Sequence, residues 1–445
     1  MINFIRISSL IISLYTTYKC IFKISNEYKL LFIIPLIYCV FILFSKSIKN
    51  KFNKNKFIFF LILVLYVKDC IMPFFMIFYD NFDGIGLINP NKYILKSIIF
   101  IALELIFIMI TIIFVKISNK RNKDIKYINN INIYILVGII GLIFSIKYPY
   151  LFIKISDVIG HEKINIINEK MSSIEIIATY FINVFKISIF ILLINYLYIK
   201  YKKNKKLKFF IFSIFITIIY GVIWISSSRF TFIVTFISAI LILIDCFNKY
   251  KKFIIGFSIV SITIILVFIS SYKTFNTSNK DTNISKLMQA YLSGPRNVAY
   301  SLEMLDYNDI LCSPKLIIND VLHPVPIVGK KFRYDSTTEL FNITVYKSYI
   351  SKDQIVPFIG QIYSYFNLIG FILIPIYIKK SIEFSEFDNA KIDIDYKYFK
   401  YLIIIWLSLI PIINITILIQ NIIYFTPFYI VIKTNKKFKN IKIKK

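Results

Sequence analysis

Among the side chains that could take part in chemistry, the arginines are the most informative. The chain of 445 residues contains only five, and all its other basic residues except two histidines are lysines. Arg229, Arg296 and Arg333 fall in segments that the distribution of charge places outside the membrane. A guanidinium presents a rigid fork of donors that fits two phosphate oxygens at once, whereas an ammonium is a point charge. These three arginines are therefore candidates for binding a pyrophosphate.

The neighbours of two of these arginines strengthen this interpretation. Arg229 follows a run of serines that ends at Ser228, so hydroxyl groups and a guanidinium would meet at the membrane boundary. Arg296 follows Gly294 and Pro295, a pair that ends a helix and turns the chain.

Each candidate also has an ordinary explanation. Arg229 could extend to the membrane surface from the end of a spanning helix, and Arg333 could pair with Asp335. His323 lies in a His-Pro-Val-Pro sequence, which predicts a stiff extended stretch ten residues before Arg333. A single histidine in a loop more often has no catalytic role than a catalytic one, so both the functional and the ordinary explanations of these residues stay open.

The sequence predicts no metal, cofactor or disulfide framework. The two histidines and five cysteines lack the spacing of a metal site. Asp393 and Asp395 resemble the D-x-D pair with which nucleotide-sugar transferases hold a metal ion. They lie in a short segment with no room for a nucleotide-binding domain, so we expect them to be solvated surface residues.

Composition places the chain in a lipid bilayer. Hydrophobic residues make up 57% of it and charged residues 18%, with a mean hydropathy of +0.69, whereas a soluble domain is about 45–50% apolar and about 25% charged. The formal net charge is nevertheless +30. A nucleic-acid-binding protein would carry such a charge on a polar surface, so we expect no nucleic acid partner and place the charges in loops between membrane spans.

The apolar stretches predict an all-α polytopic membrane protein with about twelve transmembrane helices, because a spanning helix needs roughly 17–25 mostly apolar residues. Pro411 and Asn414 should break the eleventh span. The predicted spans are 5–22, 29–45, 57–79, 93–115, 133–152, 174–199, 209–225, 230–247, 253–271, 355–378, 401–417 and 420–433.

Lysine-rich segments give the predicted orientation, since cytoplasmic loops carry an excess of basic residues. With twelve spans and both the N- and C-termini in the cytoplasm, every lysine cluster lies inside. The predicted parts are helices 1–9 in residues 1–271, a large external loop between helices 9 and 10 in 272–354, and helices 10–12 with a basic cytoplasmic tail in 355–445.

The external loop is rich enough in apolar residues to pack rather than remain disordered. Within it, an amphipathic helix at the bilayer surface is predicted. The apolar residues at helical spacing are Ile284, Leu287, Met288, Tyr291 and Leu292.

Charged residues near the middle of the spans need partners, because charge in the membrane is costly. They are Lys68, Asp69, Glu104 and Lys186. Lys68 and Glu104 lie about eleven residues from the inner ends of consecutive antiparallel spans. Their equal depth predicts an ion pair, more often a structural feature than a functional one.

Several short motifs resemble those of bacterial oligosaccharide repeat-unit polymerases of the O-antigen polymerase (Wzy) type. The motifs are Ser226–Phe230, the Tyr-Leu-Ser-Gly-Pro sequence that begins at Tyr291, Gly360–Tyr363 and Tyr365–Gly370. The long external loop late in the chain and the span count are also similar. Asn367 and Lys68 depart from the pattern, which often has glycine and arginine at these positions.

The resemblance implies a multi-pass glycosyltransferase of the bacterial cytoplasmic membrane that needs no metal or cofactor. Such an enzyme joins O-antigen, capsule or exopolysaccharide repeat units, carried on undecaprenyl pyrophosphate, at the outer face of the membrane. A chain-length regulator and a flippase are expected partners. The implied site residues are Arg229, Arg296, Arg333 and His323 for catalysis, and Ser228, Tyr291 and Gln361 for substrate binding.

Two other functions remain open. A ligase of similar build would transfer a finished glycan to another acceptor, and the sequence separates it poorly from a polymerase. A polysaccharide flippase or other transporter could also have twelve spans, but the long segment 272–354 and the lack of an internal repeat argue against it.

Overall fold

The computed structural model describes residues 1–24, 27–117, 125–128, 131–152, 172–223, 229–258, 284–348, 354–387 and 392–444. The chain divides into two compact units. The first comprises Met1–Lys120, Asp281–Phe387 and Trp406–Gln420. The second comprises Arg121–Lys280, Asp388–Ile405 and Asn421–Lys445.

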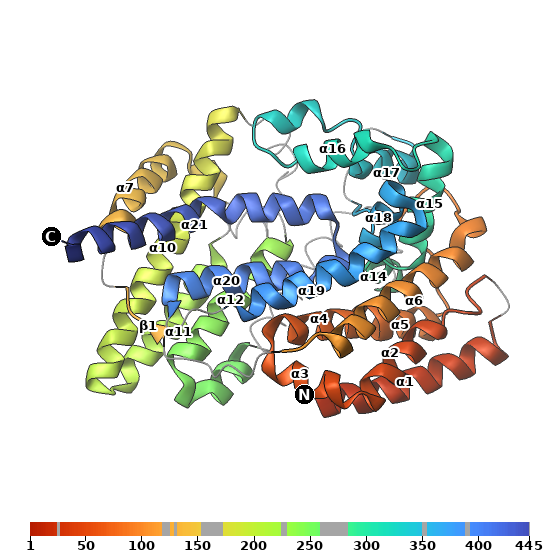
Figure 1. Cartoon of the computed structure of the whole chain (residues 1–445), viewed down its shortest axis with the longest axis horizontal. Helices are drawn as coiled ribbons and strands as arrows, with labels where there is room; N and C mark the ends of the chain where they lie inside the picture. Colours follow the sequence, from red (N-terminus) through yellow and green to blue (C-terminus); the bar gives the residue numbers. More distant parts are fainter. Residues whose placement is uncertain are drawn as a thin grey trace. The chain divides into compact units, whose positions relative to one another are not determined.

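The first unit is built from helices (Figure 1). They are α1 (Ile2–Phe22), α2 (Ile33–Phe44), α3 (Lys46–Lys54), α4 (Lys56–Tyr66), the π-helical turn η1 (Val67–Ile71), α5 (Met72–Phe78), α6 (Asn91–Phe114), α14 (Ile284–Tyr291), α15 (Pro295–Asn308), α16 (Pro314–Leu322), η4 (Val328–Lys331), α17 (Thr337–Tyr346), α18 (Phe358–Phe366), η5 (Asn367–Ile372), α19 (Leu373–Glu386) and η6 (Ile410–Ile412).

The second unit is also helical. Its elements include β1 (Ile125–Lys126), α7 (Asn132–Lys147), η2 (Pro149–Leu151), α10 (Ser173–Asn204), α11 (Leu207–Val222), α12 (Arg229–Cys246), η3 (Asn248–Tyr250), β2 (Ile392–Asp393) and most of α20 (Ile394–Ser408) and α21 (Ile415–Lys444). The two short strands pair in parallel, with Ile125 opposite Ile392.

The helical membrane class predicted from the sequence is confirmed. Among the described residues, five helices are long and apolar enough to cross a membrane, and the number rises to seven if each of two bent helix pairs is one span. The twelve spans and the cytoplasmic termini stay predictions. Most of the ninth predicted span, 253–271, lies outside the described residues.

The bent pairs show how polar residues end a span. The predicted span 29–45 is shorter in the structure, because α2 gives way to α3 at a bend of 82°. Ser45 accepts a hydrogen bond from the backbone N–H of Ile48 at 3.2 Å and so caps the new helix. Helix α3 is rich in lysine and buries only Ile48 and Phe52, as expected of a helix that lies along a membrane surface.

The break predicted at Pro411 and Asn414 is confirmed. Helix α20 ends at Ser408, and a single 3-10 turn over Ile410–Ile412 follows. The Asn414 carboxamide oxygen accepts the Ile417 N–H at 2.7 Å, which caps the start of α21. The last helix is consequently longer than the predicted span 420–433.

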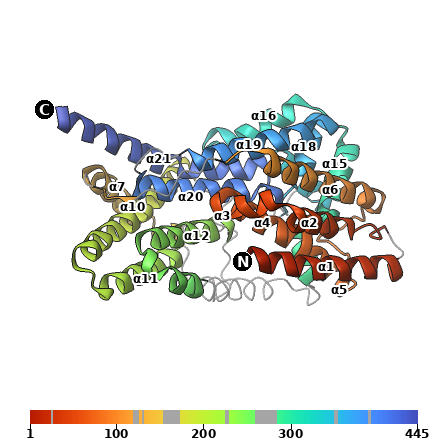
Figure 2. The same ribbon diagram turned by 60° about the horizontal axis from the view of Figure 1, so that its bottom comes forward.

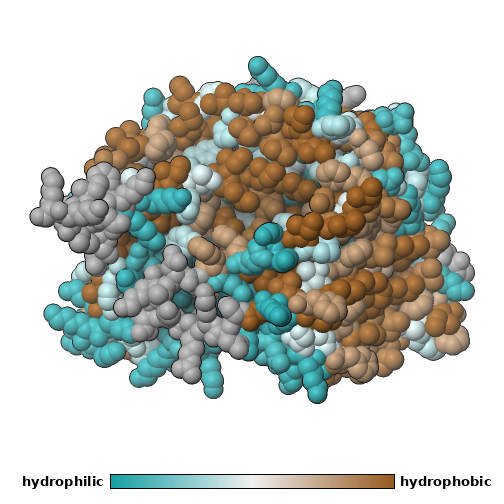
Figure 3. Space-filling view, in the orientation of Figure 1, coloured by the Kyte–Doolittle hydropathy of each residue, from teal (hydrophilic) through white to brown (hydrophobic). Residues whose placement is uncertain are grey.

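The described part of the late loop is packed, as its composition predicts. Helices α14 to α17 belong to the first unit, and α15 lies beside the start of α6 (Figures 1 and 2). Val298, Phe341 and Val345 are fully buried there. By contrast, α1 exposes Phe4, Ile7, Ile11 and Leu14, and Figure 3 shows broad apolar areas over α1 and α6. Lipid would cover such a surface.

Candidate functional site

Arg296 occupies the first turn of α15, at the turn predicted from Gly294 and Pro295. Gly294 is the N-cap and Pro295 the first helical residue, where its missing N–H costs nothing. Ser293 takes a positive φ of 54° to reverse the chain. The guanidinium therefore lies at the end of the helix where the backbone dipole is positive.

The side chains of Tyr300, Asp83 and Tyr28 contact the Arg296 guanidinium. Its Nε donates a hydrogen bond to the Tyr300 hydroxyl at 3.1 Å, and its Nη1 lies 3.6 Å from an oxygen of Asp83. The Arg296 side chain is 12% exposed and that of Asp83 71%. A guanidinium has five N–H donors, so these contacts leave donors for an anion, and an exposed Asp83 can be displaced.

Two glycines, Gly84 and Gly86, allow the loop between α5 and α6 to approach Arg296. A Cβ on Gly84 would lie 2.8 Å from Cδ of Arg296, and a Cβ on Gly86 would lie 2.8 Å from the Tyr300 hydroxyl. Tyr300 in turn donates a hydrogen bond to the carbonyl of Ile88 at 3.1 Å. Any larger side chain at these two positions would push the loop off α15.

Charges and burial set the ionisation of the site. Burial raises the pKa of Tyr28 and of Tyr300, although Arg296 opposes the shift in both, so both phenols are neutral. Burial acts to lower the pKa of Arg296, but the hydroxyl of Tyr300 and the charges of its neighbours outweigh this and raise it. Arg296 is consequently a permanent cation beside neutral donors.

Gln289, which the sequence analysis did not identify, joins α14 to the segment before α6 and to the start of α15. Its Nε2 donates to the carbonyls of Phe82 and Asp83 at 2.9 and 3.0 Å, and its Oε1 accepts the Arg296 N–H at 3.4 Å. The residue is fully buried. Gln289 and Ala290 lie on the buried side of α14, whereas Ile284 is 51% exposed.

Gln361 lies in a different cluster, around the buried carboxylate of Asp320. Asp320 accepts hydrogen bonds from the Thr337 N–H at 2.9 Å, from Gln361 Nε2 at 2.9 Å and from the Tyr365 hydroxyl. Gln361 Oε1 accepts the Ile415 N–H at 2.8 Å. Both ends of the Gln361 amide are therefore used to join α16, α17, α18 and the start of α21.

His323 does not lie in an extended stretch, and that expectation was wrong. It ends α16 with helical dihedral angles. The segment that follows, with its two prolines, forms turns. The Val325 N–H donates to the Leu322 carbonyl at 3.0 Å, and the Gly329 N–H donates to the Val325 carbonyl at 2.8 Å. These bonds outweigh the extended preference of a residue before proline.

The other predicted site residues are dispersed. Arg333 is partly exposed, and Asp335 pairs with Lys315 at 2.6 Å. Tyr291 is the last residue of α14 and is partly exposed. Arg229 begins α12 in the second unit, and its side chain and the whole of Ser228 lie outside the described part of the chain.

Asp393 and Asp395 were both expected to be solvated, and for Asp395 this expectation was wrong. Asp395 is 2% exposed and accepts a hydrogen bond from the Tyr134 hydroxyl at 2.5 Å, because α7 covers it. Asp393 lies 3.7 Å from Lys436. Within the described ranges, no three His, Cys, Asp or Glu side chains are grouped so that they could hold a metal ion.

The ion pair predicted at mid-span, between Lys68 and Glu104, is present. Lys68 Nζ lies 2.5 Å from a carboxylate oxygen of Glu104, and both side chains are 1% exposed. The neighbouring Asp69 is equally buried, and neither of its oxygens has a hydrogen-bond partner among the residues that the structure describes. Both Lys68 and Asp69 lie in η1, and π-helical turns are frequent at functional sites.

Comparison with known proteins adds no family to this description: no family model, curated protein or solved structure matches the chain.

Proposed function

We propose that this protein is a membrane-embedded glycosyltransferase that polymerises oligosaccharide repeat units carried on undecaprenyl pyrophosphate. The proposed place of reaction is the outer face of the bacterial cytoplasmic membrane. The observation that supports it best is the nearly buried guanidinium of Arg296 at the start of α15, held by Tyr300 and an exposed Asp83.

The proposed reaction needs little beyond charge stabilisation and alignment. A sugar hydroxyl of one repeat unit attacks the anomeric carbon of another chain, and the lipid pyrophosphate leaves. Negative charge grows on the departing oxygens, so preorganised donors there lower the barrier. Arg296 would supply two N–H groups in place of its contact with Asp83, and the dipole of α15 would add to its effect.

Among the remaining candidates of the first unit, Arg333 would contact the pyrophosphate, His323 would orient a hydroxyl and Tyr291 would contact substrate. Arg229 and Ser228 keep the roles proposed from the sequence, in pyrophosphate and substrate binding. Gln361 is fully buried with both ends of its amide bonded, so it would act by holding α16, α17 and α18 together. A chain-length regulator and a flippase would act beside the enzyme.

Glycan profiling after deletion and complementation tests the proposal. Loss of a polymerase should reduce long surface glycan to single repeat units, whereas unchanged chain length would contradict it. Arg296→Lys keeps the charge but removes the fork and should fail to restore long chains. Lys330→Gln, at an exposed position of η4, is the matched control and should restore them.

One observation favours a transporter as the second candidate. A buried carboxylate without a described partner at Asp69, beside an ion pair in two candidate spans, is typical of residues that carry ions or protons in membrane carriers. Loss of all surface glycan on deletion, with translocation of a lipid-linked oligosaccharide by the purified protein in vesicles, would support this candidate and not the polymerase.

A further inference from the structure

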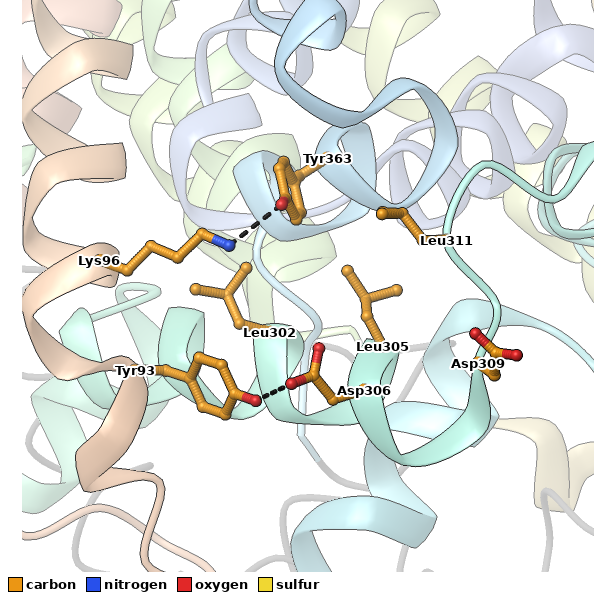
Figure 4. Close-up of a pocket in the computed structure, with 8 residues that line it drawn as sticks. All are labelled: Tyr93, Lys96, Leu302, Leu305, Asp306, Asp309, Leu311 and Tyr363. Carbon is orange, nitrogen blue, oxygen red and sulfur yellow. Dashed lines mark hydrogen bonds between the residues drawn. The ribbon is translucent and has the colours of Figure 1, made fainter.

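A pocket of about 150 Å³ opens beside α15 in the first unit (Figure 4). It lies where α15 packs on the start of α6 and on α18. Its lining residues are Tyr93, Lys96, Leu302, Leu305, Asp306, Asp309, Leu311 and Tyr363.

The pocket has an apolar floor and a polar rim. Leu302, Leu305 and Tyr363 are buried. Lys96 Nζ donates a hydrogen bond to the Tyr363 hydroxyl at 3.0 Å and lies 4.8 Å from the centre of its ring. This contact fixes the aromatic wall and uses one of the three donors of the ammonium.

The two carboxylates of the rim, Asp306 and Asp309, differ in their partners. Asp306 accepts a hydrogen bond from the Tyr93 hydroxyl and lies 3.7 Å from Lys92. Asp309 is exposed at the end of α15, and among the described residues no cation lies within ion-pair distance of it. Asp309 is therefore the carboxylate available to accept hydrogen bonds from a ligand.

Size and chemistry define the ligand. A cavity of about 150 Å³ can hold a benzene ring, so a single sugar ring is the largest unit that this open pocket could take, with its outer hydroxyls in solvent. Leucine and tyrosine side chains suit the C–H groups of a pyranose, and carboxylate oxygens suit its hydroxyls. Asp306 is paired with Lys92, but Asp309 at the rim has no cation within ion-pair distance among the described residues, so a negatively charged group placed beside it would be repelled.

We propose that this pocket binds one uncharged pyranose residue of a saccharide. The role of this pocket in the reaction rests on the proposed polymerase function. Asp306 lies ten residues after Arg296 on the same helix, or about 15 Å at 1.5 Å per residue. The pocket would then hold a sugar of the repeat unit that does not itself react.

Saturation-transfer NMR on the full-length protein in detergent tests the binding directly. The probes are methyl glucopyranoside, methyl 2-acetamido-2-deoxyglucopyranoside and the methyl glycoside of glucuronic acid. We expect signal transfer to the two uncharged sugars and none to the uronate. No transfer to any probe, or transfer to the uronate alone, would overturn the inference.

Two variants locate the binding. Leu311 is 42% exposed at the rim, so Leu311→Trp should fill the pocket without disturbing the core and should abolish transfer. Leu87→Trp, at a site that is 76% exposed and outside the pocket lining, is the control and should leave transfer unchanged. Asp309→Asn, which tolerates the positive φ of 48° at this position, should admit the uronate.

The binding assay and the glycan profile can fail separately. If Leu311→Trp still binds the uncharged sugars while deletion of the protein shortens the surface glycan, the inference is wrong and the proposed polymerase stands. If Leu311→Trp loses binding while deletion leaves glycan length unchanged, the sugar site stands and the polymerase does not.

Discussion

The ammonium of Lys68 lies 2.5 Å from a carboxylate oxygen of Glu104, and both side chains are all but inaccessible to solvent. The two residues come from consecutive candidate spans, Lys56–Phe78 and Asn91–Phe114. Inside a membrane each charge would be strongly unfavourable alone, and together they tie the two helices in one register.

Reversing this ion pair should restore stability that either single change removes. Lys68→Glu or Glu104→Lys places two like charges in contact, so each should lower the free energy of unfolding by at least the roughly 3–5 kcal/mol of a broken buried pair. The double variant should recover much of this loss. The yield of monodisperse protein in detergent and its unfolding temperature measure the effect. No recovery in the double variant would contradict the pairing.

Asp69 should respond in the opposite way to Glu104. Its carboxylate oxygens have no hydrogen-bond partner among the described residues, so Asp69→Asn removes a buried charge that accepts no hydrogen bond and keeps nearly the same side-chain shape. We expect unchanged or higher stability, by about 1–3 kcal/mol. Glu104→Gln is the comparison and should destabilise, because it leaves Lys68 unpaired. Equal losses in the two variants would contradict this account of Asp69.

Gly86 should not accept a side chain. A Cβ there would lie 2.8 Å from the hydroxyl and 2.9 Å from Cζ of Tyr300, a rigid ring, so Gly86→Ala should cost about 1–3 kcal/mol by overpacking. It should also impair any activity that depends on Arg296. The control is Gly256→Ala, where nothing lies within 4 Å of the added Cβ. Gly256 lies in the helical segment Asn248–Ser258, where alanine should stabilise by roughly 0.5–1 kcal/mol. Thermal unfolding of both variants measures the difference.

Asp320 should be essential to the fold. Asp320→Ala leaves the donors of Thr337, Gln361 and Tyr365 buried without their acceptor, and each such group costs about 1–3 kcal/mol. Asp335→Ala removes a carboxylate that is 57% exposed and paired with Lys315. It should change stability by no more than about 0.5 kcal/mol. Similar unfolding temperatures for the two variants would show that the cluster around Asp320 is not structural.

The exposed thiol of Cys312 can test the predicted orientation. The other four cysteines, Cys20, Cys39, Cys70 and Cys246, are buried. If the late loop is external, a membrane-impermeant maleimide should label Cys312 in intact spheroplasts, and Cys312→Ser should abolish the labelling. Labelling that requires lysis would place the loop in the cytoplasm and remove the basis for an external site at Arg296.

Local sequence was sufficient wherever one segment decides its own structure. Apolar stretches predicted the membrane class, Gly294 and Pro295 predicted the turn after α14, and Pro411 with Asn414 predicted the end of a span. Lys68 and Glu104 are far apart in the sequence, yet their contact could be predicted. Two consecutive spanning helices run antiparallel, so residues at the same depth in the membrane lie side by side.

Contacts between distant loops were decided by tertiary structure alone. Gln289 binds the carbonyl of Phe82, 207 positions away, and Tyr300 binds that of Ile88, 212 positions away. Nothing in hydrophobic periodicity indicates which loops meet, since periodicity reports only the face that is buried. The same reason explains the burial of Asp395. The sequence by itself therefore determined the helical membrane class and the pairing of Lys68 with Glu104, whereas only packing decided which polar side chains surround Arg296.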